Sequence, residues 1–351
     1  MEDLNSLWEN YSATGIFNSI DNNHKLKIKS PKCSEIYIST KTKIGYLDTT
    51  IDLNKVFWDI PIIDYEIPKE GVIKKQIKIN SLKKEDITDL EKKIESQKFV
   101  NCDILQQVDN PNARKYKFKD IRKINVGINT KDLISYRKKK KGAFYNCFAL
   151  IIRIKEDNKF KEIHVKVFNT GKLEIPGIQK NQTLFNVIDK LIEILQPIVG
   201  KKISYDVDKI DTVLINSNFN CNYIINRNKL FDILKFKYHI HSLYDPCSYP
   251  GIQCKFYYNP NKEKQDGICC CDKKCGPKNK ICSIISFMVF RTGSILIVGH
   301  CDEDILDVIY NYLKKILIRE FENINVQTSG EIEPKKQKTK KKRKRQIIIY
   351  A

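Results

Sequence analysis

Histidine is scarce in this chain, with five residues in 351, and neither an HExxH pair nor a glycine-rich phosphate-binding loop is present. These absences argue against zinc proteases and P-loop nucleotide hydrolases. His239 and His241 have no carboxylate at a useful spacing. We therefore expect a protein that is not an enzyme. An enzyme acting on nucleic acid is the weakest hypothesis, and metal-dependent cleavage of labelled DNA would revive it.

Long apolar segments are also missing. No apolar run reaches the roughly 20 residues that span a bilayer, and the N-terminus lacks the charged-then-apolar pattern of a signal peptide. The sequence therefore predicts an intracellular protein with no membrane partner. In that setting we expect the 12 cysteines to be reduced thiols or metal ligands.

Positive charge, in contrast, is abundant. The chain holds 63 Lys and Arg against 42 Asp and Glu, a formal net charge of +21. Nine of the eleven residues at 335–345 are Lys or Arg, and subtracting these nine still leaves +12. A body this basic predicts a polyanionic partner. We expect 321–351 to be a disordered basic tail that acts as a nuclear address, a non-specific DNA-binding arm, or both.

A short phrase occurs twice in the sequence. VFNTGKLEIPG at 167–177 returns as VFRTGSILIVG at 289–299, with six of eleven positions identical. Each copy predicts a strand, a tight Thr-Gly turn and a second strand, with Leu173, Ile175, Ile295 and Ile297 directed toward the core.

An amphipathic helix is predicted after each copy, because apolar residues follow at the same offset of 122 with spacings of 3, 1, 3, 3 and 1. The helices begin near Gln182 and Asp302, and Pro197 is expected to close the first. The apolar residues are Leu184, Val187, Ile188, Leu191, Ile194 and Leu195 in the first helix, and Leu306, Ile309, Tyr310, Leu313, Ile316 and Leu317 in the second.

The repeat continues upstream with altered spacing. DLNKVF at 52–57 resembles NRNKLF at 226–231, and YEIPKEGVIKKQIKI at 65–79 resembles YDPCSYPGIQCKFYY at 244–258. The alternative is a first repeat that starts at 121–130, but only the earlier start keeps the NKxF helix.

Two diverged copies of one unit predict an α+β fold, in which a pseudo-two-fold antiparallel sheet carries its helices on one side. The predicted divisions are an N-terminal extension at 1–32, a first repeat at 33–200 with a polar insert at about 81–142, a second repeat at 201–320 with a Cys-rich insert at 259–282, and the basic tail at 321–351.

The doubled phrase, its trailing helix and the Tyr-x-Pro…Pro-Gly-Ile segment upstream resemble the TATA-box-binding protein family, most of all its diverged members in large DNA viruses of eukaryotes. The resemblance covers residues 33–320 apart from the inserts. It implies a saddle of curved antiparallel sheet whose concave face lies in the DNA minor groove, with helices on the convex side and phenylalanines wedged between base steps at both ends.

By this resemblance Phe168 and Phe290 match the intercalating phenylalanines, and Tyr249 matches a third wedge. The competing interpretation is that both phenylalanines are core aromatics at strand ends. Their occurrence in phase with the family phrase favours the wedge. The other residues expected on the DNA face are Thr170, Thr292, Leu296 and Val298, together with Lys172, Arg153 and Lys255, which are placed to contact phosphates.

The sequence also departs from the family pattern. The fourth wedge falls on Lys69, or on Cys147 with the alternative start, and neither is aromatic. Glu174 is expected on the groove face, where its carboxylate would repel phosphate. Four further positions differ from the threonines and base-reading asparagines of the family: Pro176, Val298, Ile36 and Thr212. Strict TATA preference is therefore not implied, because the minor groove offers only a degenerate code.

The resemblance implies a transcription initiation factor that binds and bends A/T-rich promoter DNA and offers its helical face to RNA polymerase-associated factors. It implies a location in the host nucleus or a cytoplasmic viral factory, or packaging in the virion. The alternative hypothesis keeps the saddle but makes it a protein-interaction module of the viral transcription apparatus, because fold does not dictate function.

A cysteine cluster lies in the second insert. Cys269, Cys271, Cys275 and Cys282 follow the spacing C-x-C-x3-C-x6-C, and four thiolates suit a structural zinc. A catalytic zinc is not expected, because four thiolates close the coordination shell. Two alternatives stay open: a reduced loop in which cysteines simply accumulate, or a site in which Cys247 or Cys254 replaces one ligand.

Overall fold

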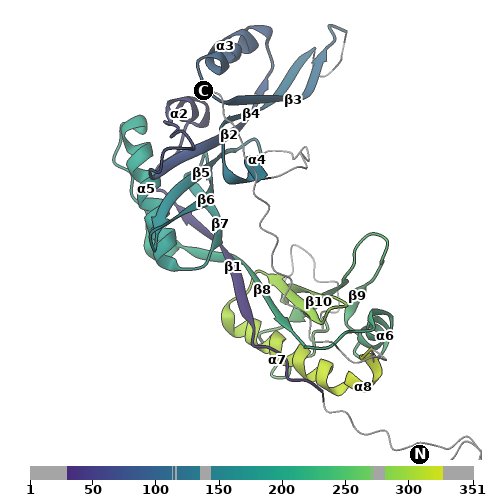
Figure 1. The fold of residues 1–351 in the computed structure, drawn as a ribbon. Helices are drawn as coiled ribbons and strands as arrows, with labels where there is room; N and C mark the ends of the chain where they lie inside the picture. The colour runs from purple at the N-terminus through teal and green to yellow at the C-terminus, as the bar shows by residue number, and fades with distance from the viewer. Residues whose placement is uncertain are drawn as a thin grey trace, which may run out of the picture.

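The computed structural model describes residues 30–112, 114, 117–134, 144–269, 271 and 281–326. The predicted basic tail lies almost entirely outside these residues, as does most of the N-terminal extension. The described strands form one twelve-stranded sheet in the order β3-β4-β2-β5-β6-β7-β1-β8-β12-β11-β10-β9, and every neighbouring pair is antiparallel. The sheet bends at its centre, where β1 and β8 pair (Figure 1).

The first repeat contributes five strands and two helices. These are β1 (Tyr37–Tyr46), α2 (Leu53–Asp59), β2 (Gly71–Ser81), β5 (Cys147–Glu156), β6 (Lys159–Phe168), β7 (Lys172–Ile178) and α5 (Asn181–Val199). The second repeat contributes β8 (Asp211–Asn220), α6 (Arg227–Asp232), η2 (Ile233–Lys237), β9 (His241–Leu243), β10 (Ile252–Tyr258), β11 (Ser283–Val289), β12 (Ser294–Gly299), α7 (Glu303–Arg319) and α8 (Phe321–Ile324), and the short η1 (Val207–Lys209) joins the repeats.

The strand order repeats on either side of the β1/β8 pair, which confirms the predicted α+β fold with an internal two-fold pattern. Reading outward, β7, β6, β5 and β2 on one side correspond to β12, β11, β10 and β9 on the other. Strand β1, which belongs to the earlier start of the first repeat, is the partner of β8. Each unit has five strands, one more than the sequence predicts.

One upstream alignment is wrong. Residues 65–79 do not correspond to 244–258, because β2 lies two places from β6 in the sheet, whereas β10 lies directly beside β11, the counterpart of β6. The counterpart of β10 is β5, which pairs with β6. The error arises because the insert separates β2 from β5 in the first repeat, while β9 and β10 are close together in the second.

The insert after β2 enlarges the sheet. It forms α3 (Lys84–Glu95), β3 (Val100–Asp109), β4 (Phe118–Gly127) and the short α4 (Thr130–Ile134). Strand β4 pairs along β2, and β3 forms the new edge. The segment RKINVGINT is thus largely in a strand, and it adds to the edge of the first repeat. Helix α3 covers this addition on the same side as α2 (Figure 1).

Helix starts are set by side-chain caps at matching places in the two repeats. Asp52 accepts hydrogen bonds from the backbone of Asn54 and Lys55 at α2, and Asn226 accepts from Lys229 at α6. Asp302 caps α7 as expected. Pro197 does not close α5. It lies in the last turn, where its missing N–H removes a single hydrogen bond, and the helix ends at Gly200, whose φ of 70° is left-handed.

The predicted helix faces are buried against the sheet. All six apolar residues predicted for α7 are buried, and so are those predicted for α5 except Ile194, which is half-buried. Each repeat has its own cluster of buried residues, here called the first-repeat core and the second-repeat core. Helices α2 and α5 cover one, and α6, α7 and α8 cover the other, all on the outer side of the bent sheet (Figure 1).

The segments leading into the two central strands are exchanged between the cores. Cys33 and Ile36 precede β1 yet pack in the second-repeat core, where Tyr310 Oη donates to Ser34 O at 2.9 Å. Reciprocally, Ile203 and Tyr205 precede β8 and pack in the first-repeat core. The repeats are therefore joined by more than the β1/β8 pairing.

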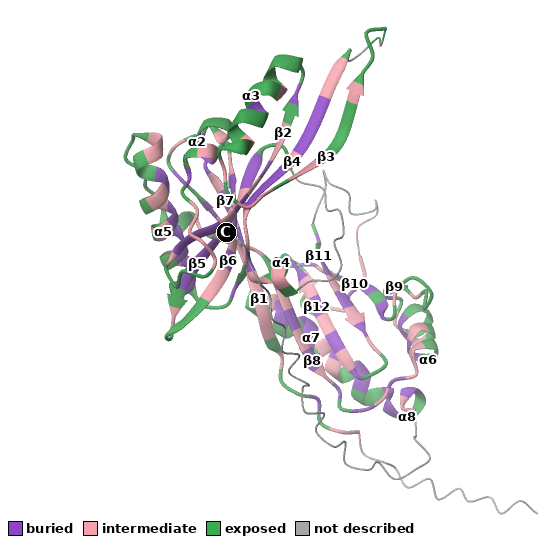
Figure 2. Ribbon diagram, turned by 45° about the horizontal axis from the view of Figure 1, so that its top comes forward, coloured by how far each residue is buried: buried purple, intermediate pink, exposed green. Residues whose placement is uncertain are grey.

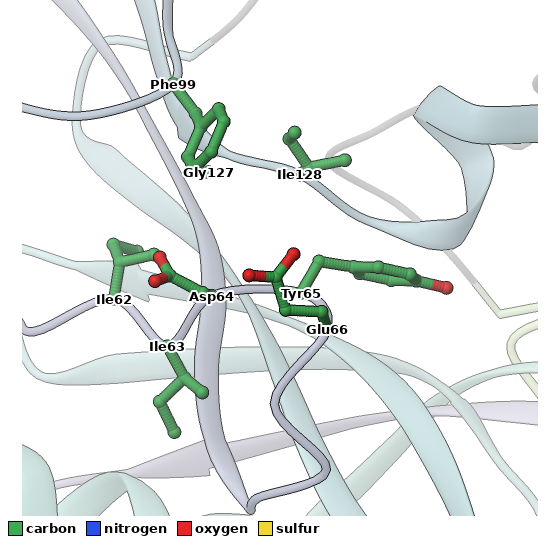
Figure 3. A pocket seen from close by; sticks show the side chains of 8 residues that line it. All are labelled: Ile62, Ile63, Asp64, Tyr65, Glu66, Phe99, Gly127 and Ile128. Atoms are coloured by element: carbon green, nitrogen blue, oxygen red, sulfur yellow. The ribbon is translucent and has the colours of Figure 1, made fainter. Parts of the chain in front are cut away.

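A small hollow lies where the insert meets the loop before β2. Residues 62–66 line one side, and Phe99, Gly127 and Ile128 line the other (Figure 3). Asp64 and Glu66 bring two carboxylates to it, so it does not suit a polyanion. Within the described ranges, none of the helices has the length and apolar character to cross a membrane.

Candidate nucleic-acid interface

The strands of both repeats have one face buried beneath the helices and one open face. In β6, Ile163, Val165 and Val167 are buried, whereas the alternating His164 and Lys166 are half-buried. In β12, Ile295 and Ile297 are buried, and the residues between them are half-buried. Figure 2 shows this alternation along the central strands. The predicted orientation of the doubled phrase is therefore confirmed.

The glycine of each Thr-Gly turn lies close against a backbone carbonyl oxygen. Gly171 and Gly293 have φ of 81° and 77°. A Cβ would lie 2.4 Å from Thr49 O at Gly171 and 2.4 Å from Tyr223 O at Gly293. Glycine is therefore required at both turns, which accounts for its presence at this position in both copies of the phrase.

These turns fix the two phenylalanines at matching places. Phe168 ends β6, and Phe290 follows β11 directly. Gly171 N–H donates to Phe168 O, and Gly293 N–H donates to Phe290 O, both at 3.0 Å. Both side chains are half-buried rather than buried in a core. They belong to the open face, as the wedge interpretation expects.

Around Phe290 the structure gathers the aromatic predicted to join it. The rings of Tyr249 and Phe290 meet edge to face at 6.0 Å. A Cβ at Gly251 would lie 3.0 Å from the Phe290 ring, so glycine leaves room for that ring. Tyr249 Oη contacts Met288 Sδ at 3.6 Å. This end of the open face is a compact group of apolar and aromatic side chains.

At the other end the structure reveals an aromatic that the sequence analysis missed. Cys147 on β5 faces Phe168 in the register. Gly251 likewise lies opposite Phe290, because the adjacent pair in the β10/β11 register is Ile252 with Val289. Tyr145 therefore matches Tyr249, two residues earlier. The fourth aromatic is therefore expected at Tyr145 rather than at Lys69 or Cys147, and the strand register, not the local sequence, provides this match.

Lysines surround this first-repeat end. Lys78 Nζ lies 3.6 Å from the ring centroid of Tyr145, and Lys172 Nζ lies 5.7 Å from that of Phe168. Tyr145 itself is 49% exposed. Cation–π contacts at exposed sites are weak, about 0.5–1 kcal/mol. The lysines can therefore leave the rings to contact phosphates.

Arg153 is not placed as predicted. It faces the open side of β5 but is 6% exposed, and it donates to Ile67 O at 2.8 Å and Tyr65 O at 2.9 Å. Its guanidinium also lies 4.9 Å from the Tyr65 ring centroid. Arg153 therefore anchors the loop before β2, and it is unavailable to phosphate in this structure.

Glu174 is on the open face, as expected, but its charge is balanced. Lys166 on the neighbouring strand β6 forms an ion pair with it at 2.6 Å. The pKa of His164, which lies on β6 with Lys166, is lowered by burial and by the nearby Lys166 and Lys131.

Two of the predicted phosphate contacts are accessible. Lys255 is exposed on β10, and Lys172 is half-buried on β7.

The remaining predicted residues fall into two groups. Leu296 and Val298 are half-buried on the open face of β12. Thr170 and Thr292 are exposed, but they lie in the turns rather than in strands. The two threonines each follow a phenylalanine by two residues, and Leu296 and Val298 lie on a strand between the two phenylalanines.

The centre of the open face carries neither of the residues predicted near it. Ile36 lies before β1 and packs against the second-repeat core, and Thr212 lies at the start of β8. The register instead places Thr40 opposite Asn216 and Thr42 opposite Leu214. These four are the central side chains of the open face.

Three of the four predicted metal ligands come together. The sulfur atoms of Cys269, Cys271 and Cys282 lie within 4.8 Å of one another. Cys275 lies outside the described residues. Cys254 is buried in the second-repeat core and contacts Ser242 Oγ at 3.3 Å, so it does not replace a ligand.

Known proteins resemble this chain. It is 29% identical over 197 residues to a TATA-box-binding protein-like protein of Acanthamoeba polyphaga mimivirus, across 52% of this chain and 50% of that protein. The chain thus spans about half the length of the curated relative it matches. Among solved structures it is similar to Methanococcus jannaschii TBP, with a TM-score of 0.38, 13% identity, and coverage of 82% of this chain and 99% of that one. No protein-family model matches.

The match to the mimivirus protein confirms the resemblance that the doubled phrase indicated. This chain is similar to a diverged, viral TATA-box-binding protein-like protein. The open face, with an aromatic group at each end and lysines along it, is its candidate nucleic-acid interface.

Proposed function

We propose that this chain is a transcription initiation factor that binds double-stranded DNA in the minor groove, bends it, and recruits transcription machinery through its helices. In this proposal it is a binding protein rather than an enzyme. The supporting observation is the placement of Phe168 and Phe290 at equivalent ends of one open sheet face, each held by a glycine turn.

The chemistry of that face fits a minor groove. Apolar wedges unstack base steps, and the bend then lets more protein surface contact the duplex. Phe168 with Tyr145 forms one wedge pair, and Phe290 with Tyr249 forms the other. Lys78, Lys172 and Lys255 supply phosphate contacts, which provide most of the affinity in such complexes.

The four central side chains of the open face predict weak discrimination between DNA sequences. Thr40, Thr42 and Leu214 offer no amide to base edges, and Asn216 alone among the four does. The proposal therefore favours A/T-rich DNA through groove width and ease of kinking, rather than a strict TATA sequence.

A bending assay tests the proposal directly. Fluorescence energy transfer is measured across short A/T-rich and G/C-rich duplexes at near-physiological salt. The wild-type chain is expected to bend the A/T-rich duplex more strongly. The double variant Phe168→Ala/Phe290→Ala is expected to lose the bend and at least about tenfold in affinity, since stacking on a base contributes about 1–3 kcal/mol.

Phe236→Ala is the matched control. Phe236 is 65% exposed but lies in η2, among the helical elements rather than on the open face. Its loss should leave bending unchanged. DNA binding without a bend, or a bend that survives the double variant, would overturn the wedge mechanism and favour a saddle that binds a protein partner instead.

A further inference from the structure

We propose that Cys269, Cys271 and Cys282 bind one structural zinc ion at the base of the loop between β10 and β11. This inference does not depend on DNA binding. The three sulfurs come from residues on both sides of that loop, and Cys282 directly precedes β11.

The sulfur geometry suits zinc. Tetrahedral zinc with Zn–S bonds of about 2.3 Å places its sulfurs about 3.8 Å apart. Cys271 Sγ and Cys282 Sγ are 3.8 Å apart. A disulfide requires a separation of about 2.05 Å, so the two sulfurs are not bonded to each other. Soft thiolates also select zinc over magnesium or calcium.

Hydrogen bonds and an ion pair order the segment that leads to Cys269. Tyr257 N–H donates to Gly267 O at 3.1 Å, which returns the chain alongside β10. The Gln265 amide binds Asn259 O at 2.7 Å, and Lys262 pairs with Asp266 at 2.6 Å. This ordered segment, 259–268, delivers Cys269 to the start of β11.

Gly267 shows how closely this segment approaches the sheet. Its φ is 76°, and a Cβ there would lie 2.8 Å from the ring of Phe256. Phe256 belongs to the second-repeat core. One side of the proposed site is therefore fixed to the core, and Cys282, at 2% exposure, fixes the other.

A metal at this place closes the loop. Ordering a long polar connection costs chain entropy, which three thiolates bound to one ion can offset. The cluster lies at the opposite ends of β10 and β11 from Tyr249 and Phe290. We therefore expect zinc to stabilise the outer strands of the second repeat without contributing to the aromatic wedge.

Elemental analysis of the full chain, purified without oxygen or chelators, is the first test. About one zinc per chain is expected, because a structural site holds a single ion. Cys271→Ser should reduce the zinc content to background, and Cys271→His should restore part of it. Cys247→Ser is the matched control, since Cys247 is exposed and outside the cluster, and it should retain the full content.

Two further measurements separate loss of metal from loss of fold. Cobalt replacement should give the visible bands of a tetrahedral site with thiolate charge transfer, and these should vanish in Cys271→Ser. A chelator should lower the melting temperature of wild type but not that of Cys271→Ser. A folded wild type without zinc, a Cys271–Cys282 disulfide, an iron–sulfur chromophore, or equal zinc in Cys271→Ser would each overturn the proposal.

Discussion

Lys75 is a buried lysine whose hydrogen-bond partners cannot be read from the sequence. It lies in β2 between Lys74 and Gln76, where alternation alone would expose one lysine of the pair to water. Lys75 alternates with Ile73 and Ile77 on the core face of β2, and it is 0% exposed. Its ammonium donates to Trp58 O at 3.0 Å and Ile60 O at 2.8 Å. Alternation can assign Lys75 to a face of the strand, but it does not reveal the distant backbone carbonyls that make a buried ammonium tolerable.

Burial lowers the pKa of Lys75 from 10.5 to about 8, although Asp59 acts in the opposite direction. Between these two pH values the unfolded chain binds a proton that the folded chain does not, so this group adds stability as pH rises. Relative to Lys75→Met, wild type is expected to gain about 2–3 kcal/mol in unfolding free energy over that range.

Urea unfolding of both proteins at several pH values measures this difference. Subtracting the Lys75→Met curve removes the other lysines and tyrosines that titrate in the same range. A difference that stays constant from pH 7 to 10.5 would show that Lys75 keeps an ordinary pKa when folded.

The correspondence between Tyr145 and Tyr249 was missed for a different reason. Tyr145 follows a long insert, so no fixed offset connects it to Tyr249, and only the pairing of Cys147 with Phe168 reveals the match. Arg153 could not be predicted either. The alternation of β5 puts Arg153 on the predicted face of the strand. The loop carbonyls that bind its guanidinium belong to Tyr65 and Ile67, more than eighty residues away in the sequence. Long-range partners of this kind are outside the reach of local pattern.

At the scale of elements, the parts that the sequence predicted best are those with strong periodicity. Helices α5 and α7 and the strand pairs β6/β7 and β11/β12 all come from one phrase and its trailing apolar stripe. The features that the sequence predicted least well are β9, which has only three residues, and the order of β2 and β5 in the sheet. A short strand has too few residues to show alternation, and the insert hides which strands are neighbours.

The glycine turns give a prediction about these elements. Gly293→Ala is expected to destabilise the protein by about 3 kcal/mol or more, because a positive φ costs about 1–2 kcal/mol and a methyl 2.4 Å from Tyr223 O adds an overpacking cost of about 1–3 kcal/mol. Gly171→Ala should behave alike. Denaturant unfolding measures both.

Gly177→Ala is the matched control. Gly177 has a φ of 88°, but nothing lies within 4 Å of a Cβ built there. Only the backbone cost of about 1–2 kcal/mol is expected. Equal losses at Gly177 and Gly293 would mean that the approach to the Tyr223 carbonyl is not what requires glycine.

At the scale of the whole molecule, the exchange of segments between the cores makes the two repeats one unit. Cys33 is 4% exposed in the second-repeat core, and Asn222 Nδ2 donates to Lys32 O at 2.8 Å. Removal of this segment should therefore destabilise the repeat at the far end of the chain. A shorter chain that starts at Tyr37 is expected to lose about 2–4 kcal/mol relative to one that starts at Ser30, from lost burial and hydrogen bonds.

Thermal unfolding followed by hydrogen exchange checks this. Amides of β8 and α7 should lose protection in the chain that starts at Tyr37, and both chains should unfold in a single transition, because each core holds part of the other repeat. A loss confined to β5 and β6 would contradict the exchange of segments.

The contact between Ser34 and Tyr310 also orders events during synthesis. Residue 34 leaves the ribosome long before residue 310, so the first repeat must wait with its N-terminal segment undocked. For that time β1 has β7 on one side and an open edge on the other, where β8 will later pair. An open strand edge invites pairing with another nascent chain. On polysomes, neighbouring copies of the first repeat therefore compete with the second repeat for β1, and slower translation between residues 200 and 310 should favour the wrong pairing.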